Sequence, residues 1–268
     1  MKIPDDFRVE PGSKIKLKGW DPAATPGLSK DEGEALLLVH RRRLDELQYL
    51  LHAEGQRAVL VIFQAMDTGG KDGVIRDVFE GVNPVAIKVH SFKAPSAEEA
   101  AHDFLWRHHQ RLPPRGEIGV HNRSHYESVL IERVRRLAPK DTWEARYEQI
   151  NAWEKMVCAE GTLVLKFFLH ISKEEQLERL RRRLEDPRRA WKFNPADLEE
   201  RKLWDEYQGA YEDVLERCST RWAPWHIVRA DKKWYRNALV SGAIVRAMEA
   251  RAPRLPAARF DPSRFKIE

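Results

Sequence analysis

The sequence predicts an α/β protein with one parallel five-stranded sheet sandwiched between helices. Short apolar runs of strand length alternate with longer runs in which apolar residues recur at the helical period. A parallel strand pair needs a crossover connection, usually a helix, so this alternation favours parallel pairing. The expected strands span residues 58–63, 85–90, 117–121, 162–170 and 225–228.

The helices are expected between these strands. In chain order they cover 29–53, the stretch from a glycine-rich turn to Glu80, 96–111, 126–137, 142–160, a helix from Ser172 into an arginine-rich segment, a long helix after Pro195, and 233–251. Ser96 with Glu99, and Ser172 with Glu175, have the spacing of helix N-terminal caps.

No internal repeat or convincing linker divides residues 29–251, so we expect them to form a single domain. Residues 1–28 mix Lys, Gly and Pro and are expected to be an irregular N-terminal arm. Residues 252–268 are punctuated by proline and are expected to be an irregular C-terminal tail.

Composition excludes several classes of protein. The 268 residues are 42% hydrophobic and 33% charged, enough for one good core or two modest ones. No stretch approaches the roughly 20 apolar residues that span a bilayer, and the N-terminus lacks a secretory hydrophobic region, so we expect a cytoplasmic protein without a membrane partner. Cys158 and Cys218 are expected to be reduced.

Charge indicates the kind of partner. The net charge is +5, and basic residues cluster at 41–43, 133–136 and 179–192. This distribution indicates an anionic partner. No recognisable nucleic-acid-binding motif accompanies it, so a nucleic acid is not expected.

A glycine-rich turn follows the first strand and precedes a helix. Successive backbone N–H groups and a helix N-terminus bind anions, so residues 64–73 are expected to hold phosphate. The phosphate contacts are assigned to Thr68, Gly69, Gly70, Lys71, Asp72 and Gly73. The alternative is a simple strand-to-helix turn with a solvated lysine.

The turn departs from the P-loop pattern G-x-x-x-x-G-K-[ST]. Ala65 replaces the first glycine, and Asp72 replaces the hydroxyl residue. Asp67 would weaken phosphate binding by like-charge repulsion, so it indicates a bound metal ion or a catalytic role.

A second polar run, residues 121–127, follows the third expected strand. Ligands gather at the carboxyl ends of parallel strands, so this run is expected to lie beside the glycine-rich turn. Arg123 is expected to stabilise developing phosphoryl charge, and Glu127, with Asn122, to organise a metal. Alternatively, Ser124 and Glu127 form a helix capping box. Phe92, after the second strand, is a candidate to flank a nucleobase.

The arginine-rich segment has two interpretations. Its cations are either a solvated helix face paired with nearby glutamates, or a lid over about residues 179–195 that closes on phosphates. His102, His108 and His109 have no clear carboxylate or cysteine companion, so a zinc site is not expected.

Several collinear stretches closely resemble the polyphosphate kinase 2 family. They are F-Q-A-M-D-T-G-G-K-D-G, G-V-N-P, S-F-K-A-P-S, H-D-F-L-W-R, G-E-I-G-V-H-N-R-S-H-Y-E, L-K-F-F-L-H-I-S-K-E-E-Q, D-P-R-R-A-W-K-F-N-P-A-D-L and A-P-W-H-I-V-R-A-D-K-K-W-Y. The resemblance implies a P-loop kinase-like fold with a helical basic lid. It also implies magnesium-dependent transfer of the terminal phosphoryl group of inorganic polyphosphate to a nucleotide.

The resemblance also implies roles at matching positions. Asp67, Lys71, Arg123 and Arg183 are assigned to catalysis, Arg189 and Lys192 to phosphate binding, Asn83, Phe92, Asn122 and Glu127 to the nucleotide, and Asp67 and Glu127 to Mg²⁺. At Glu127 the chain is most similar to the class that accepts AMP, so AMP is the expected acceptor, ADP accepts a second phosphoryl group, and ATP is the final product. Departures are Ala65 for glycine, His121 for phenylalanine, Ser128 for aspartate and Arg229 for proline.

Two other functions remain open from the sequence. One is an ATP-dependent nucleoside monophosphate kinase, and the other is a non-catalytic polyanion-binding protein. Several helices have apolar faces, which makes a homo-oligomer plausible.

Overall fold

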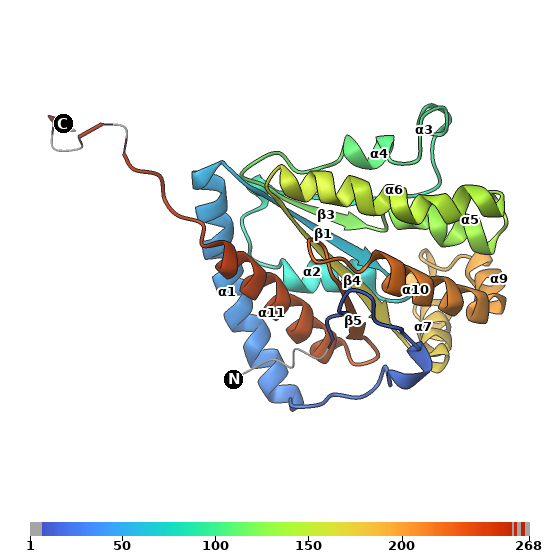
Figure 1. The fold of residues 1–268 in the computed structure, drawn as a ribbon. Helices are drawn as coiled ribbons and strands as arrows, with labels where there is room; N and C mark the ends of the chain where they lie inside the picture. Colours follow the sequence, from blue (N-terminus) through green and yellow to red (C-terminus); the bar gives the residue numbers. More distant parts are fainter. Residues whose placement is uncertain (1–6, 259, 262–263, 266–268) are drawn as a thin grey trace.

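The computed structural model describes residues 7–258, 260–261 and 264–265; the other residues of the expected arm and tail lie outside it (Figure 1). The strands β1 (Ala58–Gln64), β2 (Ile87–Ser91), β3 (Ile118–Asn122), β4 (Thr162–His170) and β5 (Trp225–Arg229) form one sheet. Their order is β2-β3-β1-β4-β5, and every pairing is parallel. The predicted five-stranded parallel sheet is confirmed.

Helices cover both faces of the sheet (Figure 1). One face carries α1 (Lys30–Glu54), α2 (Lys71–Val78) and α11 (Lys233–Arg251), and the other carries α6 (Lys140–Ala159) and α10 (Trp204–Cys218). Leu44 and Leu47 of α1 are buried against the core, as is Ile244 of α11. Helices α1, α6 and α11 lie within a few residues of their expected bounds.

The central position of β1 determines where the site forms. Phe63 lies between Asn122 of β3 and Phe167 of β4. After β1 the chain passes to the face that carries α2, whereas after β3 it passes to the face that carries α6. The two connections therefore diverge and leave a crevice outside the carboxyl ends of neighbouring strands.

Three expected helices are interrupted, and these predictions were wrong. The stretch 96–111 holds only α3 (Ala97–Ala100) and α4 (Trp106–His109), because the side chain of Asp103 accepts from the N–H groups of Leu105 and Trp106 and starts a new turn. The long helix expected after Pro195 divides into α9 (Ala196–Lys202) and α10, with Leu203 between them.

The third interruption lies beside the site. Instead of a helix over 126–137 there is a 3-10 turn, η3 (His125–Val129), and a short helix, α5 (Ile131–Val134). Ser124 is the N-cap of η3, but its hydroxyl accepts from the N–H of Tyr126, so the alternative capping box with Glu127 does not form. Tyr126 and Val129 are both fully buried at a spacing of three, which suits the 3-10 period.

The remaining short elements begin at or near residues that cap them. A 3-10 turn, η2 (Pro84–Ala86), delays the start of β2. The basic segment contains α7 (Lys173–Glu185) and α8 (Pro187–Ala190). Ser96 and Glu99 form a complete capping box, whereas Ser172 accepts from the N–H of Glu175 without the reciprocal bond.

The described part of the N-terminal arm is irregular apart from one 3-10 turn, η1 (Leu17–Gly19), but it packs tightly. Phe7, Val9 and Leu17 are buried. The N–H of Val9 donates to the carbonyl of Trp225, and the N–H of Ile227 donates to the carbonyl of Phe7. The arm therefore covers the outer edge of β5 and shields it from further strand pairing.

We expect the Leu44→Ala substitution to destabilise the protein by about 2 to 5 kcal/mol, because it leaves a cavity between α1 and the core. Leu38 lies on the same helix and is 56% exposed, so Leu38→Ala is the matched control and should change the free energy of unfolding by less than about 0.5 kcal/mol. Denaturant unfolding of both variants measures the difference; equal losses would contradict the burial of α1 described here.

Candidate functional site

The glycine-rich turn forms a tight loop closed by Lys71. The ammonium of Lys71, the first residue of α2, donates back to the carbonyls of Ala65 at 2.9 Å and Met66 at 3.4 Å. Gly70 has a φ of 96°, and a Cβ on Gly69 would lie 2.5 Å from that of Ala65. Only glycine tolerates both positions. The first N–H groups of α2 have no partner within the helix, so they suit an anion.

Three buried side chains hold this loop from behind. Gln176 donates to the carbonyl of Asp67 at 2.8 Å, Arg179 to that of Thr68 at 3.2 Å, and Arg236 to that of Gly70 at 3.2 Å. All three engage carbonyls, so they fix the loop without occupying N–H groups. These roles of Gln176, Arg179 and Arg236 were not predicted from the sequence; the available signal was Arg236 next to the apolar run of α11.

An ion pair connects the loop to the end of β3. Nη2 of Arg123 lies 2.5 Å from Oδ1 of Asp67. The backbone of Arg123 has a φ of 63°, and its N–H donates to the carbonyl of Phe63 at 3.1 Å. A left-handed conformation at a residue other than glycine is strained and is often found at functional sites. This geometry turns the arginine from its strand towards Asp67.

Opposite charges determine the ionisation of the cluster. Burial raises the pKa of Asp67, but Lys71 and Arg123 outweigh it and hold that pKa below its usual value. Burial lowers the pKa of Lys71 to about 8, with Arg123 acting in the same direction. For Arg123 the carboxylates of Glu127 and Asp67 outweigh burial and raise the pKa further. The cluster therefore holds a carboxylate at Asp67 and a permanent cation at Arg123.

Glu127 lies on the other side of Arg123. With its amide oriented so that both atoms are satisfied, Gln64 donates to Oε1 of Glu127 at 3.0 Å and accepts from Ser124. Burial raises the pKa of Glu127, although Arg123 and Lys71 oppose the shift. The end of β1 thus orients a carboxylate on η3.

Two of the three predicted cations of the basic segment, Arg183 and Lys192, line a cavity together with the glycine-rich turn. Arg183 donates to Oδ2 of Asp197 and to the carbonyl of Lys192, both at 3.1 Å. Lys192 lies 3.9 Å from Oδ2 of Asp72. Arg189 instead pairs with Asp186 on the exposed side.

Of two other predicted nucleotide residues, one lies away from the site and one lies beside the glycine-rich turn, as expected for residues 121–127. Asn83 caps η2, and its N–H donates to Asp45 at 3.0 Å, so it lies apart from the site. Asn122 donates to Asp72 at 2.7 Å and therefore belongs beside the phosphate loop.

Two cavities meet at the ion pair. The phosphate-loop cavity, about 540 Å³, is lined by residues 67–73, Asn122, Arg183 and Lys192. The aromatic cavity, about 510 Å³, is lined by residues that include Phe104, Glu127, Tyr207 and Tyr211. Both are also lined by Asp67, Phe92, Lys93 and Arg123. A phosphate chain in one cavity and a second ligand in the other would meet at Asp67 and Arg123.

The site offers two carboxylates to a metal. Asp67 and Glu127 both line the aromatic cavity. Among the described residues, no cluster of three or more His, Cys, Asp or Glu side chains is arranged as a complete metal site. Mg²⁺ often takes one or two carboxylates and completes its ligands with substrate phosphates and water, so this donor set fits Mg²⁺.

The chain is similar to proteins of known activity. The family model described as Polyphosphate kinase 2 matches residues 27–256. The chain is 49% identical to the AMP/ADP-polyphosphate phosphotransferase of Meiothermus ruber, over 98% of this chain and 99% of that protein. It is 47% identical to the ADP-polyphosphate phosphotransferase of Rhodopseudomonas palustris, over 93% of this chain and 91% of that protein.

A solved structure extends the similarity to the fold. The polyphosphate kinase 2 from Arthrobacter aurescens TC1 superposes with a TM-score of 0.93 at 43% identity, covering 97% of this chain and 93% of that one. The family match, the sequence identities and the shared P-loop kinase-like fold agree. The chain belongs to the polyphosphate kinase 2 family.

Proposed function

We propose that this chain transfers the terminal phosphoryl group of inorganic polyphosphate to an adenine nucleotide where the two cavities join. The observation that carries the proposal is the Asp67–Arg123 pair, which lines both cavities. Family membership supports the reaction class, a phosphotransferase acting between polyphosphate and nucleotides. Polyphosphate would occupy the phosphate-loop cavity, and the nucleotide would occupy the aromatic cavity.

The residues supply positioning and charge rather than covalent chemistry. Lys71 and the N-terminus of α2 bind phosphate oxygens, and Arg183 and Lys192 extend the cationic surface along the chain. Arg123 stabilises the charge of the transferring group, and Asp67 orients the acceptor. Asp67 and Glu127 would hold Mg²⁺, which when bound neutralises phosphate charge.

AMP, followed by ADP, is the acceptor that the site supports best. The Meiothermus ruber relative carries the name of an AMP/ADP-polyphosphate phosphotransferase. The family resemblance at Glu127 implies the AMP-accepting class. Ser128, where the family pattern has aspartate, donates its hydroxyl to the carbonyl of His125 at 2.7 Å. This position therefore contributes to the turn and offers no carboxylate to a metal.

Other expectations stay predictions. They are the closure of the lid over about residues 179–195, the single domain over 29–251, the homo-oligomer and the cytoplasmic location. Among the helices that the structure describes, none has the length and apolar character needed to cross a membrane.

We expect purified protein with AMP, Mg²⁺ and long-chain polyphosphate to form ADP and then ATP, and to form neither without polyphosphate. Nucleotide products are separated by chromatography. Transfer with ATP as the only phosphoryl donor would indicate a nucleoside monophosphate kinase instead. Retention of polyphosphate without any nucleotide product would indicate a binding protein.

We expect Lys71→Met and Asp67→Asn each to lower kcat by at least about a hundredfold, because each removes a charge that faces the transferring group. Both substitutions preserve volume, so circular dichroism and thermal unfolding should show a folded protein. Lys88→Met is the matched control. Lys88 lies on β2, its side chain is exposed, and it pairs with Glu117 rather than with a residue of the site. Activity close to that of the unmodified protein in either site variant would refute these assignments.

A further inference from the structure

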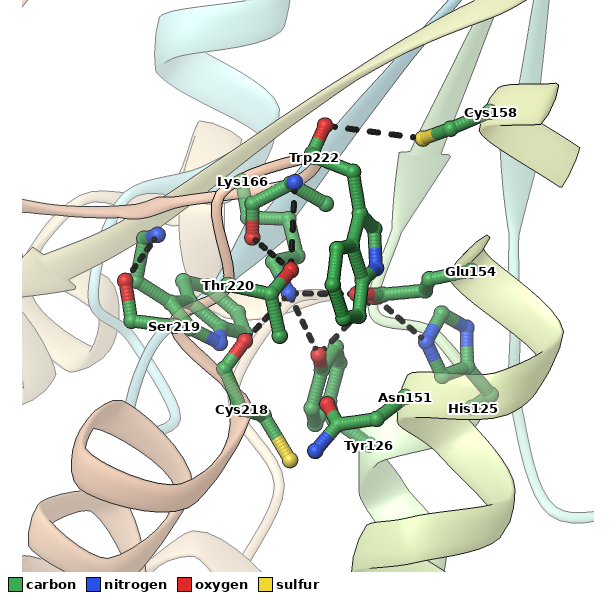
Figure 2. Close-up of polar contacts among 12 residues, drawn as sticks. His125, Tyr126, Asn151, Glu154, Cys158, Lys166, Cys218, Ser219, Thr220 and Trp222 are labelled. Carbon is green, nitrogen blue, oxygen red and sulfur yellow. Dashed lines mark hydrogen bonds and ion pairs between the residues drawn. The ribbon is translucent and has the colours of Figure 1, made fainter. Parts of the chain in front are cut away.

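A buried polar network lies beneath the end of β3 (Figure 2). It consists of Glu154 on α6, Lys166 on β4, and the consecutive residues His125 and Tyr126 on η3. Each of the four side chains is at most 1% exposed. None of them has a role in the function proposed above.

Glu154 binds both consecutive residues of η3. Its Oε1 accepts from the hydroxyl of Tyr126 at 2.8 Å and from Nε2 of His125 at 3.2 Å. Its Oε2 accepts from Lys166 at 2.6 Å. A single carboxylate thus fixes two adjacent side chains of the turn against α6.

The ammonium of Lys166 has a hydrogen-bond acceptor for each of its three N–H groups. It donates to Oε2 of Glu154, to the hydroxyl of Tyr126 at 2.7 Å and to the carbonyl of Cys218 at 2.7 Å. The rings of Tyr126 and Trp225 each lie 5.2 Å from it. The network is therefore specific in geometry and balanced in charge, as a buried ion pair must be to persist.

Stability alone does not account for this network. A buried ion pair is often no more stabilising than well-packed apolar residues of the same volume, because both charges lose their hydration. Its four members connect η3 to α6 and β4, two consecutive elements that come later in the chain. What they fix in space is η3, which carries Glu127 and begins two residues after Arg123.

The turn needs an external anchor. Arg123 has a strained left-handed backbone, and the residues after it form a 3-10 turn instead of a stable helix. The hydroxyls of Ser124 and Ser128 bond within the turn. Outside it, Ser124 contacts the side chain of Gln64 on β1, and the carbonyl of Ser128 accepts from Arg146 of α6 at 2.9 Å. The hydrogen bonds from His125 and Tyr126 to Glu154 hold the turn against α6, between the two functional side chains.

We propose that Glu154 and Lys166, acting through His125 and Tyr126, are positioning residues that hold Arg123 and Glu127 in the geometry of phosphoryl transfer. The proposal rests on the roles proposed above for Arg123 and Glu127. Gln176, Arg179 and Arg236 hold the phosphate loop independently. Loosening the network should therefore affect the transfer step and leave polyphosphate binding largely intact.

Tyr126→Phe tests this with a minimal change, since it removes one buried hydroxyl from the network. Tyr147→Phe is the matched control: Tyr147 is 1% exposed, lies on α6, and its hydroxyl accepts from Arg133 at 3.0 Å, outside the network. We expect Tyr126→Phe to lower kcat about tenfold, with the KM for polyphosphate changed less than about twofold, and Tyr147→Phe to leave both unchanged. Thermal unfolding is measured for each, and assays are run well below both midpoints.

Unchanged kcat in Tyr126→Phe, or equal losses in both variants, would overturn the positioning role. The paired variant Glu154→Gln/Lys166→Met removes both charges at nearly constant volume and should show the same loss of kcat as Tyr126→Phe or a larger one. Activity at the level of the unmodified protein in the folded paired variant would also overturn it.

Coupling identifies the residue through which the network acts. In the double variant Tyr126→Phe/Glu127→Gln, the fold-loss of kcat should be smaller than the product of the fold-losses of the two single variants. In the double variant Tyr126→Phe/Lys192→Ala, it should equal that product. Independent effects with Glu127→Gln would overturn the positioning role. Unchanged kcat in Glu127→Gln alone would instead contradict the function proposed for that carboxylate.

Discussion

The ion pair between Asp67 and Arg123 joins the loops that follow two neighbouring parallel strands, and the rest of the site is arranged around it. Asp67 comes from the loop after the central strand, and Arg123 comes from the strained residue at the end of β3. The connections after these strands pass to opposite faces of the sheet. Without a link between them, the two cavities would have no fixed junction.

This link depends on charge balance among partly buried groups. Lys71 and Arg123 keep Asp67 ionised despite its burial, while Asp67 and Glu127 keep Arg123 charged. The cluster has cations and carboxylates in close proximity before any ligand binds. A polyanion and a divalent cation would bind to complementary parts of it, so the protein provides a preorganised electrostatic environment rather than a nucleophile.

The parts of this account that could be predicted from the sequence are those with local signals. Strands β1 and β4 are long apolar runs, and the glycine-rich turn has a recognisable pattern, so Asp67, Lys71 and Arg123 were assigned correctly to one edge of the sheet. The interrupted helices at 96–111 and 126–137 were missed because side chains of Asp103 and Ser124 cap turns inside otherwise helical patterns. Asn83 was assigned through a family stretch alone, and its contacts place it elsewhere. The supports of the site, Arg236 behind the loop and Lys166 under η3, bind partners far away in the sequence, which periodicity cannot reveal.

The most direct test of the central claim separates ligand binding from transfer at Arg123. Arg123→Lys keeps the positive charge but loses the planar geometry that lets the guanidinium contact Asp67 and a phosphoryl group together. Single-turnover transfer, measured beside separate binding of polyphosphate and AMP, should slow by about a hundredfold while both affinities change less than about threefold. A loss explained by weaker binding of one ligand, with unchanged transfer once both are bound, would contradict a junction at Asp67 and Arg123.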